Sequence, residues 1–258
     1  MNVLDSFSLK GKTVVVTGGA GLYGRQIVEA VAEAGARTVM ASRNVAKLEE
    51  VAAALRDRGF DASAVAMDQG DESSVRAARD QVLERCGSLH GLVNNAVART
   101  MKSFDDDADR FQESMRVNAT GLFTVTRAFG EVMAAGGSIV NIGSIMGLIG
   151  LEPLNYRGTS MSGWAPDYFF HKGGMVNFTR FCASYYGPKG TRCNCVHPGG
   201  FQTPDHPEAF VRNYSERTCL GRMANATDLK GVVVFLLADA SRYITGANIP
   251  VDGGYTAK

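Results

Sequence analysis

A glycine-rich turn joins the first two regular segments of this chain and limits what it can fold into. Residues 13–16 form a short apolar run, typical of a strand buried on both faces, and residues 24–34 carry apolar side chains at helical spacing. This order predicts a βα unit whose backbone N–H groups can approach a phosphate closely. Tight packing alone would explain an isolated glycine triplet, so the flanking strand and helix carry the argument. The turn residues expected to bind the pyrophosphate of a dinucleotide are Gly18, Gly21, Leu22, Tyr23 and Gly24.

The same alternation continues along the chain. Strands are expected at residues 38–41, 62–66, 91–93, 138–142, 192–196 and 247–251, and helices at 45–58, 72–85, 110–133, 168–186 and 227–237. This pattern predicts an α/β fold with a doubly wound parallel sheet of the Rossmann type, in a single domain over residues 1–258. Residues 145–166 and 199–217 interrupt the rhythm, and we expect these long loops to line a substrate site.

The composition excludes several other classes of protein. Lys and Arg number 27 and Asp and Glu 26, with no basic block, so a nucleic-acid partner is not expected. Five cysteines without framework spacing favour a reducing compartment. The start of the chain does not read as a signal peptide, and no apolar run approaches about 18 residues. We therefore expect a soluble cytoplasmic protein with no membrane partner.

The end of the second strand bears on the choice of cofactor. Ser42 and Arg43 stand where an acidic residue would bind the ribose 2′-hydroxyl of NAD. A guanidinium suits a 2′-phosphate, so NADP is expected and NAD is the alternative; a surface salt bridge is the other explanation for Arg43. Asp68, just past the third strand, is expected either to accept from the adenine amino group or to cap the helix that starts near residue 71.

Tyr168 and Lys172 stand four residues apart and would share one face of a helix. A free phenol has a pKa of about 10, and an ammonium one turn away would lower it, so the pair is a candidate general acid/base. Ser144, at the end of a buried strand, can hold a carbonyl or alcohol oxygen, and Asn118 can hold a water beside the lysine through its side chain or an opened carbonyl. The Tyr-x-x-x-Lys spacing also arises by chance, so its place after Ser144 gives it weight.

The order and spacing of these motifs resemble those of a short-chain dehydrogenase/reductase along essentially the whole chain. The matching segments are Asn94-Asn95-Ala96, Val117-Asn118, Asn141 to Ser144, Tyr168 to Lys172, Pro198-Gly199 with Thr203, and Val251 to Gly254. The resemblance implies Tyr168 as general acid/base, Lys172 as its electrostatic partner, Ser144 as oxygen stabiliser and Asn118 as water holder. It places Asn95 and Thr203 near the nicotinamide half of the cofactor, with Pro198 and Gly199 in the cofactor site, and it implies a homo-oligomer, usually a tetramer.

The expected function is therefore an NAD(P)-dependent enzyme that interconverts a secondary alcohol and a ketone, with a small molecule as substrate. Asn155, Tyr156, Arg157 and Trp164 in the first long loop would suit a sugar or polyol, and Arg99 could meet an anionic group. Loop packing and surface pairing are the simpler explanation for each of these residues taken singly.

Two departures from the family pattern leave alternatives open. Leu22 stands where a glycine is common, and Ser144 lies 24 residues before Tyr168, about twice the usual interval. Both features are typical of nucleotide-sugar epimerases and dehydratases that retain their cofactor, although 258 residues leave no room for the larger second domain of that branch. The long interval also makes Ser160 and Ser162 rivals of Ser144. A cofactor-binding regulator without catalysis is the third alternative.

A metal site is not expected. Cys193, Cys195 and His197 alternate along one strand and share a face, but buried cysteines in such strands usually pack as small apolar residues. For His171, between Tyr168 and Lys172, helix packing is the simpler explanation.

Overall fold

Seven parallel strands form one sheet in the computed structural model, which describes residues 2–258. Every predicted strand is present, and the order β3-β2-β1-β4-β5-β6-β7 confirms the doubly wound Rossmann-type topology. The chain winds outward from β1 to β3 and then crosses to β4, so the winding reverses between β1 and β4. The strands are β1 (Thr13–Thr17), β2 (Arg37–Ser42), β3 (Ala62–Ala66), β4 (Leu89–Asn94), β5 (Met133–Ile142), β6 (Arg192–Pro198) and β7 (Asn248–Val251).

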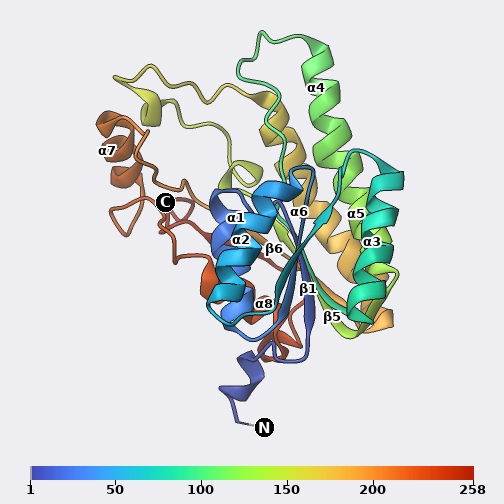
Figure 1. Cartoon of the computed structure of the whole chain (residues 1–258). Coiled ribbons are helices and arrows are strands. Elements are labelled where there is room, and N and C mark those ends of the chain that lie inside the picture. Colours follow the sequence, from blue (N-terminus) through green and yellow to red (C-terminus); the bar gives the residue numbers. More distant parts are fainter. Residues whose placement is uncertain (1) are drawn as a thin grey trace.

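Helices cover both faces of the sheet (Figure 1). One face carries α1 (Leu22–Glu33), α2 (Val45–Asp57) and α8 (Lys230–Leu237), and the other carries α3 (Glu72–Cys86), α5 (Gly121–Gly130) and α6 (Pro166–Tyr186). The helices α4 (Ala108–Met115) and α7 (Glu208–Arg217) lie toward the top of Figure 1, as do the long loops.

The two helical layers explain why the central strands read as unbroken apolar runs. All five residues of β1 are buried; Val14 and Val16 pack in the core beneath α1 and α8, whereas Val15 packs in the core on the opposite face. Alternate side chains of a strand point to opposite faces, so a covered sheet needs apolar residues at every position. Each such side chain contributes about 1.5–3 kcal/mol on burial.

The predicted helix over residues 110–133 is wrong in two respects. The segment consists of α4, a π-helical turn at Arg116–Thr120, and α5, which ends at Gly130. β5 then begins at Met133, which pairs with Leu89 before the register shifts between Leu89 and Gly91. The small residues between Met133 and Ser138 lack the apolar alternation of a strand, so pairing with β4 determines where β5 begins.

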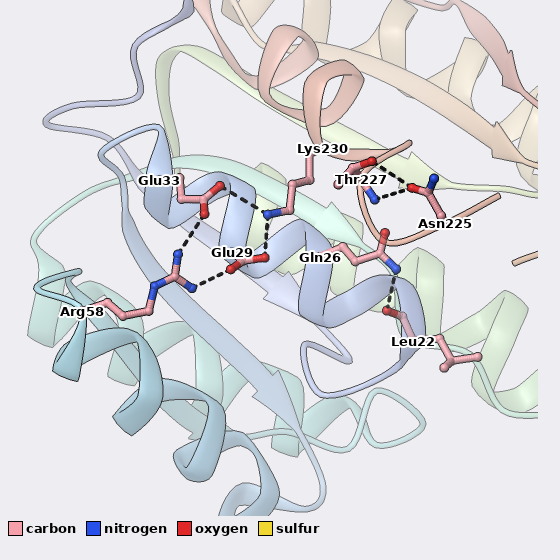
Figure 2. A network of polar contacts seen from close by, with 8 residues as sticks. All are labelled: Leu22, Gln26, Glu29, Glu33, Arg58, Asn225, Thr227 and Lys230. Carbon is pink, nitrogen blue, oxygen red and sulfur yellow. Dashed lines mark hydrogen bonds and ion pairs between the residues drawn. The ribbon is translucent and has the colours of Figure 1, made fainter. Parts of the chain in front are cut away.

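Four charged side chains tie the helices on one face together (Figure 2). On α1, Glu29 and Glu33 each accept from Arg58, just past α2, at 2.5 and 2.9 Å. The same two carboxylates accept from Lys230 of α8 at 2.5 and 3.3 Å. The hydrogen bonds from Lys230 and Arg58 outweigh partial burial and lower the pKa of Glu29. Exposed ion pairs are worth about 0–1 kcal/mol each, so this network fixes the positions of the helices more than it stabilises the fold.

Candidate active site

The glycine turn is held against the end of β4. Gly18 has φ +67°, and a Cβ there would lie 2.9 Å from the Cα of Ala96. The hydroxyl of Thr17 accepts from the backbone N–H groups of Asn95 and Ala96 at 3.0 and 2.9 Å. In return, the Asn95 amide donates to the carbonyl oxygens of Thr17 and Gly18 at 3.0 and 3.1 Å. The cradle is thus held together by the protein's own hydrogen bonds, and Asn95 is one of its supports.

The start of α1 opens toward this cradle. Gly21 is the N-cap residue, and a Cβ at Gly24 would overlap the carbonyl oxygen of Gly18. The N–H groups of Leu22, Tyr23 and Gly24, the first in the helix, have no intrahelical acceptor and favour an anion. These residues fit the pyrophosphate of a dinucleotide through backbone atoms. The side chain of Tyr23 is engaged elsewhere, because its hydroxyl donates to the carbonyl oxygen of Gly199 at 2.7 Å.

A cavity of about 1210 Å³ runs from this turn across the carboxyl ends of the strands. It passes the winding reversal between β1 and β4, where ligands of such sheets bind. Both predicted loop segments contribute to its wall. All the predicted site residues except Asn118 line it, namely Gly18, Gly21, Leu22, Tyr23, Gly24, Ser42, Arg43, Asp68, Asn95, Ser144, Tyr168, Lys172, Pro198, Gly199 and Thr203.

One end of the cavity is bordered by Ser42, Arg43 and Lys47. Arg43 is exposed and forms no ion pair or side-chain hydrogen bond with any residue in 2–258, so the salt-bridge explanation for it is wrong. Lys47 was not predicted as a site residue. It stands in the first turn of α2, where the side chain of Asn44 accepts from its backbone N–H. Asn44, a residue type that favours N-caps, was the sequence signal that could have placed Lys47 at the start of this helix.

Asp68 lines the same end of the cavity and is not a helix cap. Its carboxylate accepts from the N–H of Gly70 at 2.9 Å. The cap of α3 is Asp71, which accepts from the N–H groups of Ser73 and Ser74. The capping alternative for Asp68 is therefore wrong.

The first turns of α6 bring Tyr168 and Lys172 to the middle of the cavity. The Lys172 ammonium lies 5.8 Å from the centre of the Tyr168 ring and donates to the carbonyl oxygen of Ile142 at 2.5 Å. Burial alone would raise the pKa of Tyr168, but the charges of Lys172 and Arg99 and a hydrogen bond with Ser144 outweigh it, so that pKa is lowered. Burial also lowers the pKa of Lys172, an effect that Tyr168 opposes. The two groups therefore act on each other as an acid/base pair requires.

Ser144 lies next to this pair, and its rivals lie elsewhere. It is buried at the end of β5, and its hydroxyl accepts from the N–H of Met146 at 3.1 Å. Ser162 borders the cavity from an exposed loop position, and Ser160 does not line it. Of the three hydroxyls, only that of Ser144 contributes to lowering the pKa of Tyr168.

Asn118 is buried in the π-helical turn and does not line the cavity. Its side chain accepts from the N–H of Ala98 and donates to the carbonyl oxygen of Ala98, both at 2.8 Å. It also donates to the hydroxyl of Ser114 at 3.0 Å. The side chain is thus occupied by the loop after β4, which leaves the backbone carbonyl as the remaining way for Asn118 to hold a water.

Arg99, which the sequence suggested could meet an anionic group, lies against Tyr168, a contact that the sequence did not predict. Its guanidinium carbon lies 4.2 Å from the centre of the Tyr168 ring, on the cavity wall. Its positive charge also opposes the burial-driven rise in the pKa of Tyr156, a residue of the first long loop. Asn155 by contrast is fully buried and donates to the hydroxyl of Tyr255 at 2.7 Å, and neither Arg157 nor Trp164 lines the cavity.

The remaining candidates pack in the interior. His197 contacts the carbonyl oxygen of Ser144 at 3.0 Å and the side chain of Asn248 at 2.8 Å. His171 is buried with its ring edge-on to Tyr168, at 5.3 Å between ring centres. Across residues 2–258, no group of three or more His, Cys, Asp or Glu side chains is arranged to hold a metal ion. None of the helices in that range is both long and apolar enough to cross a membrane.

Comparison with known proteins agrees with this geometry. A family model described as Enoyl-(Acyl carrier protein) reductase matches residues 21–256. Galactitol 2-dehydrogenase (L-tagatose-forming) from Cereibacter sphaeroides is 32% identical, over 99% of each chain. Among solved structures, a short-chain type dehydrogenase/reductase from Mycobacterium marinum superposes with a TM-score of 0.89 at 29% identity, over 100% of both chains.

Two further structures carry a nicotinamide cofactor. A gluconate 5-dehydrogenase from Burkholderia cenocepacia J2315, in complex with NADP and tartrate, gives a TM-score of 0.87 at 30% identity, over 100% of both chains. NAD⁺-bound xylitol dehydrogenase gives 0.86 at 25% identity, over 95% of this chain and 99% of its own. The fold and site define a nicotinamide-dependent oxidoreductase of alcohols and ketones. The chain belongs to the short-chain dehydrogenase/reductase family.

Proposed function

We propose that this enzyme interconverts a hydroxylated secondary alcohol and its ketone with NADP, using Tyr168 as general acid/base. The observation that carries the proposal is the place of Tyr168 in the cavity that begins at the glycine cradle, with Arg99 and Lys172 at 4.2 and 5.8 Å from its ring centre. These charges and Ser144 lower the pKa of the phenol. Lowering the pKa of a phenol from about 10 brings it closer to neutral pH and so favours its use as a general acid/base.

The cofactor, when bound, accepts the hydride of the alcohol carbon or donates it to the ketone carbon. In the oxidative direction, Tyr168 as phenolate takes the hydroxyl proton of the substrate. Ser144 hydrogen bonds with the same oxygen, and Lys172 stabilises the phenolate before that transfer. The Lys172 ammonium is fixed by the carbonyl oxygen of Ile142, so its charge does not need to be repositioned during the reaction.

NADP is favoured over NAD by the charge at one end of the cavity. Arg43 and Lys47 both line it, and neither side chain forms an ion pair within residues 2–258. Asp68 borders the same end, but its carboxylate already accepts from the N–H of Gly70. Two cations without acidic partners suit the doubly charged 2′-phosphate.

The substrate is proposed to be a polyol or a sugar derivative. The supporting observations are the two long loops on the cavity wall and two similar proteins, the galactitol and gluconate dehydrogenases, whose names specify such substrates. The expected polar loop residues Asn155, Arg157 and Trp164 do not support it, because none of them lines the cavity.

The direct test follows absorbance at 340 nm while wild-type enzyme and NADPH meet a panel of keto-sugars, hydroxy acids and cyclic ketones. Consumption of NADPH in step with ketone reduction supports an oxidoreductase. An epimerase or dehydratase would instead retain its cofactor through purification and show no net change at 340 nm. A regulator without catalysis would turn over none of the panel, and that result would contradict the proposal.

A homo-oligomer, expected as a tetramer, is proposed from an aromatic surface on α5 and α6. Phe123, Phe181 and Tyr185 are exposed there, and Phe181 stacks on Tyr185 with 6.1 Å between ring centres. Large exposed apolar patches mark association surfaces. Light scattering of the purified protein should give a multiple of the chain mass, and Phe181→Glu should lower it.

A reducing compartment, the cytoplasm, is proposed because all five cysteines are free.

A further inference from the structure

Arg99 presents a cation to the reactive part of the cavity. The residue follows the glycine-cradle contacts of Asn95 and Ala96 by a few positions, in the loop after β4. In the described part of the chain, residues 2–258, its guanidinium forms no ion pair with a carboxylate. Its nearest recorded contact is the face of the Tyr168 ring, at 4.2 Å from the ring centre. The planar fork of a guanidinium matches a carboxylate in two parallel hydrogen bonds, and here that fork is not taken up by the protein's own acids.

A buried chain of hydrogen bonds sets Arg99 and Tyr168 relative to each other. Ala98, the neighbour of Arg99, is clamped by Asn118, which donates to the hydroxyl of Ser114. Ser114 in turn donates to the carboxylate of Asp167 at 2.5 Å, and Asp167 is the neighbour of Tyr168. Asp167 and Ser114 are both fully buried, so this link is shielded from water. The loop after β4 and the first turn of α6 are therefore held as one unit, with the cation and the phenol at its two ends.

The surroundings of Arg99 favour an anion. Tyr156 lies near it in the first long loop. The positive charge of Arg99 acts to lower the pKa values of Tyr156, Tyr168 and Lys172. The acidic residues that line the cavity, Asp68 and Asp205, lie beyond salt-bridge distance of it. Two cations, Arg99 and Lys172, thus face the space in which the reacting oxygen must sit.

The geometry points to Arg99 as the binding group for a carboxylate of the substrate, which makes the substrate a 2- or 3-hydroxy acid or the matching oxo acid, sugar acids included. This inference rests on the proposed function and specifies its substrate class. The guanidinium carbon of Arg99 lies 4.2 Å from the centre of the Tyr168 ring, and its charge lowers the pKa of that phenol. An anion on its fork must therefore lie close to the oxygen being protonated. A carboxylate on the reacting carbon or on the next carbon can meet Arg99 while the reacting oxygen meets Tyr168.

The test compares kcat/KM for short 2- and 3-hydroxy acids with kcat/KM for their primary amides, in wild type and in Arg99→Gln. Because Arg99 also acts on Tyr168, its loss affects both substrates, and the acid-to-amide ratio cancels that shared effect. The wild type should prefer the acids, and the substitution should lower the ratio roughly 10- to 100-fold. Arg99→Lys should retain part of the preference. Lys10→Gln removes an exposed cation outside the cavity and should leave the ratio within about twofold of wild type.

Binding supplies a second readout that does not require turnover. With NADPH present, the same hydroxy acids should raise the melting temperature of the wild type and not that of Arg99→Gln. An unchanged acid-to-amide ratio in Arg99→Gln would overturn the inference and leave the proposed function intact. The same conclusion would follow if the wild type oxidised uncharged alcohols but neither bound nor oxidised the acids. A wild type that binds the acids but turns over neither acids nor uncharged alcohols would instead contradict the proposed function alone.

Discussion

The hydroxyl of Tyr23 donates a hydrogen bond to the carbonyl oxygen of Gly199 across 2.7 Å, which joins the first turn of α1 to the loop after β6. Burial raises the pKa of Tyr23, so the phenol remains a donor at every working pH. Both residues line the cavity, and Gly199 lies against Asp252, where a Cβ would sit 3.0 Å from the Cα of that residue. The bond therefore fixes the first turn of α1 relative to the loop after β6, and these two segments form two walls of the cofactor cleft.

Tyr23→Phe removes this bond without removing the ring, so it should weaken NADPH binding about 2- to 10-fold. Isothermal titration measures the change. Tyr243→Phe, at a fully exposed position, is the matched control and should bind like wild type. Equal affinities for all three proteins would show that the bond plays no part in shaping the cleft.

Replacement of both Arg43 and Lys47 by Ala should weaken NADPH binding roughly 10- to 100-fold, because charge-assisted hydrogen bonds to the 2′-phosphate are lost. NADH lacks that phosphate and serves as the internal control, with an affinity that should remain nearly constant. Stronger binding of NADH than of NADPH by the wild type would contradict the assignment of NADP.

The pH dependence of alcohol oxidation should report the charge of Arg99. The reaction needs Tyr168 as phenolate, so activity rises as pH passes the Tyr168 pKa. Lys172, Arg99 and Ser144 outweigh burial and lower that pKa. Removing one of the cations raises it, so Arg99→Gln should move the acidic limb of the pH–rate profile to higher pH. An uncharged alcohol is the appropriate substrate for this profile, and an unmoved limb would exclude Arg99 from tuning Tyr168.

His171 should make the protein less stable in acid. Burial, followed by the charges of Lys172 and Arg99, lowers the pKa of His171 to about 3. The unfolded chain therefore binds a proton below a pH of about 6.5 that the folded chain does not, and the free energy of unfolding falls as pH drops toward 3. Between pH 7.5 and 5.0 this loss is about 2 kcal/mol, and His171→Leu should lack it. Urea unfolding of both proteins at both pH values measures the difference. An equal loss of unfolding free energy in the wild type and in His171→Leu would contradict the lowered pKa of His171.

The sequence predicted the sheet and most of the cavity lining because both depend on local pattern. Strands covered on two faces are apolar at every position, as β1 is, and parallel strands bring their carboxyl ends to one edge. The residues predicted at those ends, Ser42, Asn95, Ser144 and Pro198 among them, accordingly line one cavity.

The prediction failed where distant contacts decide. Arg116–Thr120 is π-helical within an otherwise helical pattern, and the first part of β5 is defined by pairing with β4 rather than by its own residues. Asn155 is directed away from the cavity by Tyr255, a partner 100 residues further along the chain. Arg99 meets Tyr168 through a loop without periodicity, and no spacing rule connects them.

Tyr168→Phe tests the central claim most directly, because it removes one hydroxyl and leaves the ring between Arg99 and Lys172. We predict that kcat falls about 10²- to 10⁴-fold, while the dissociation constant for NADPH and the circular dichroism spectrum stay within error of wild type. A variant that binds NADPH normally and still turns over at near wild-type rate would show that the proton comes from another group.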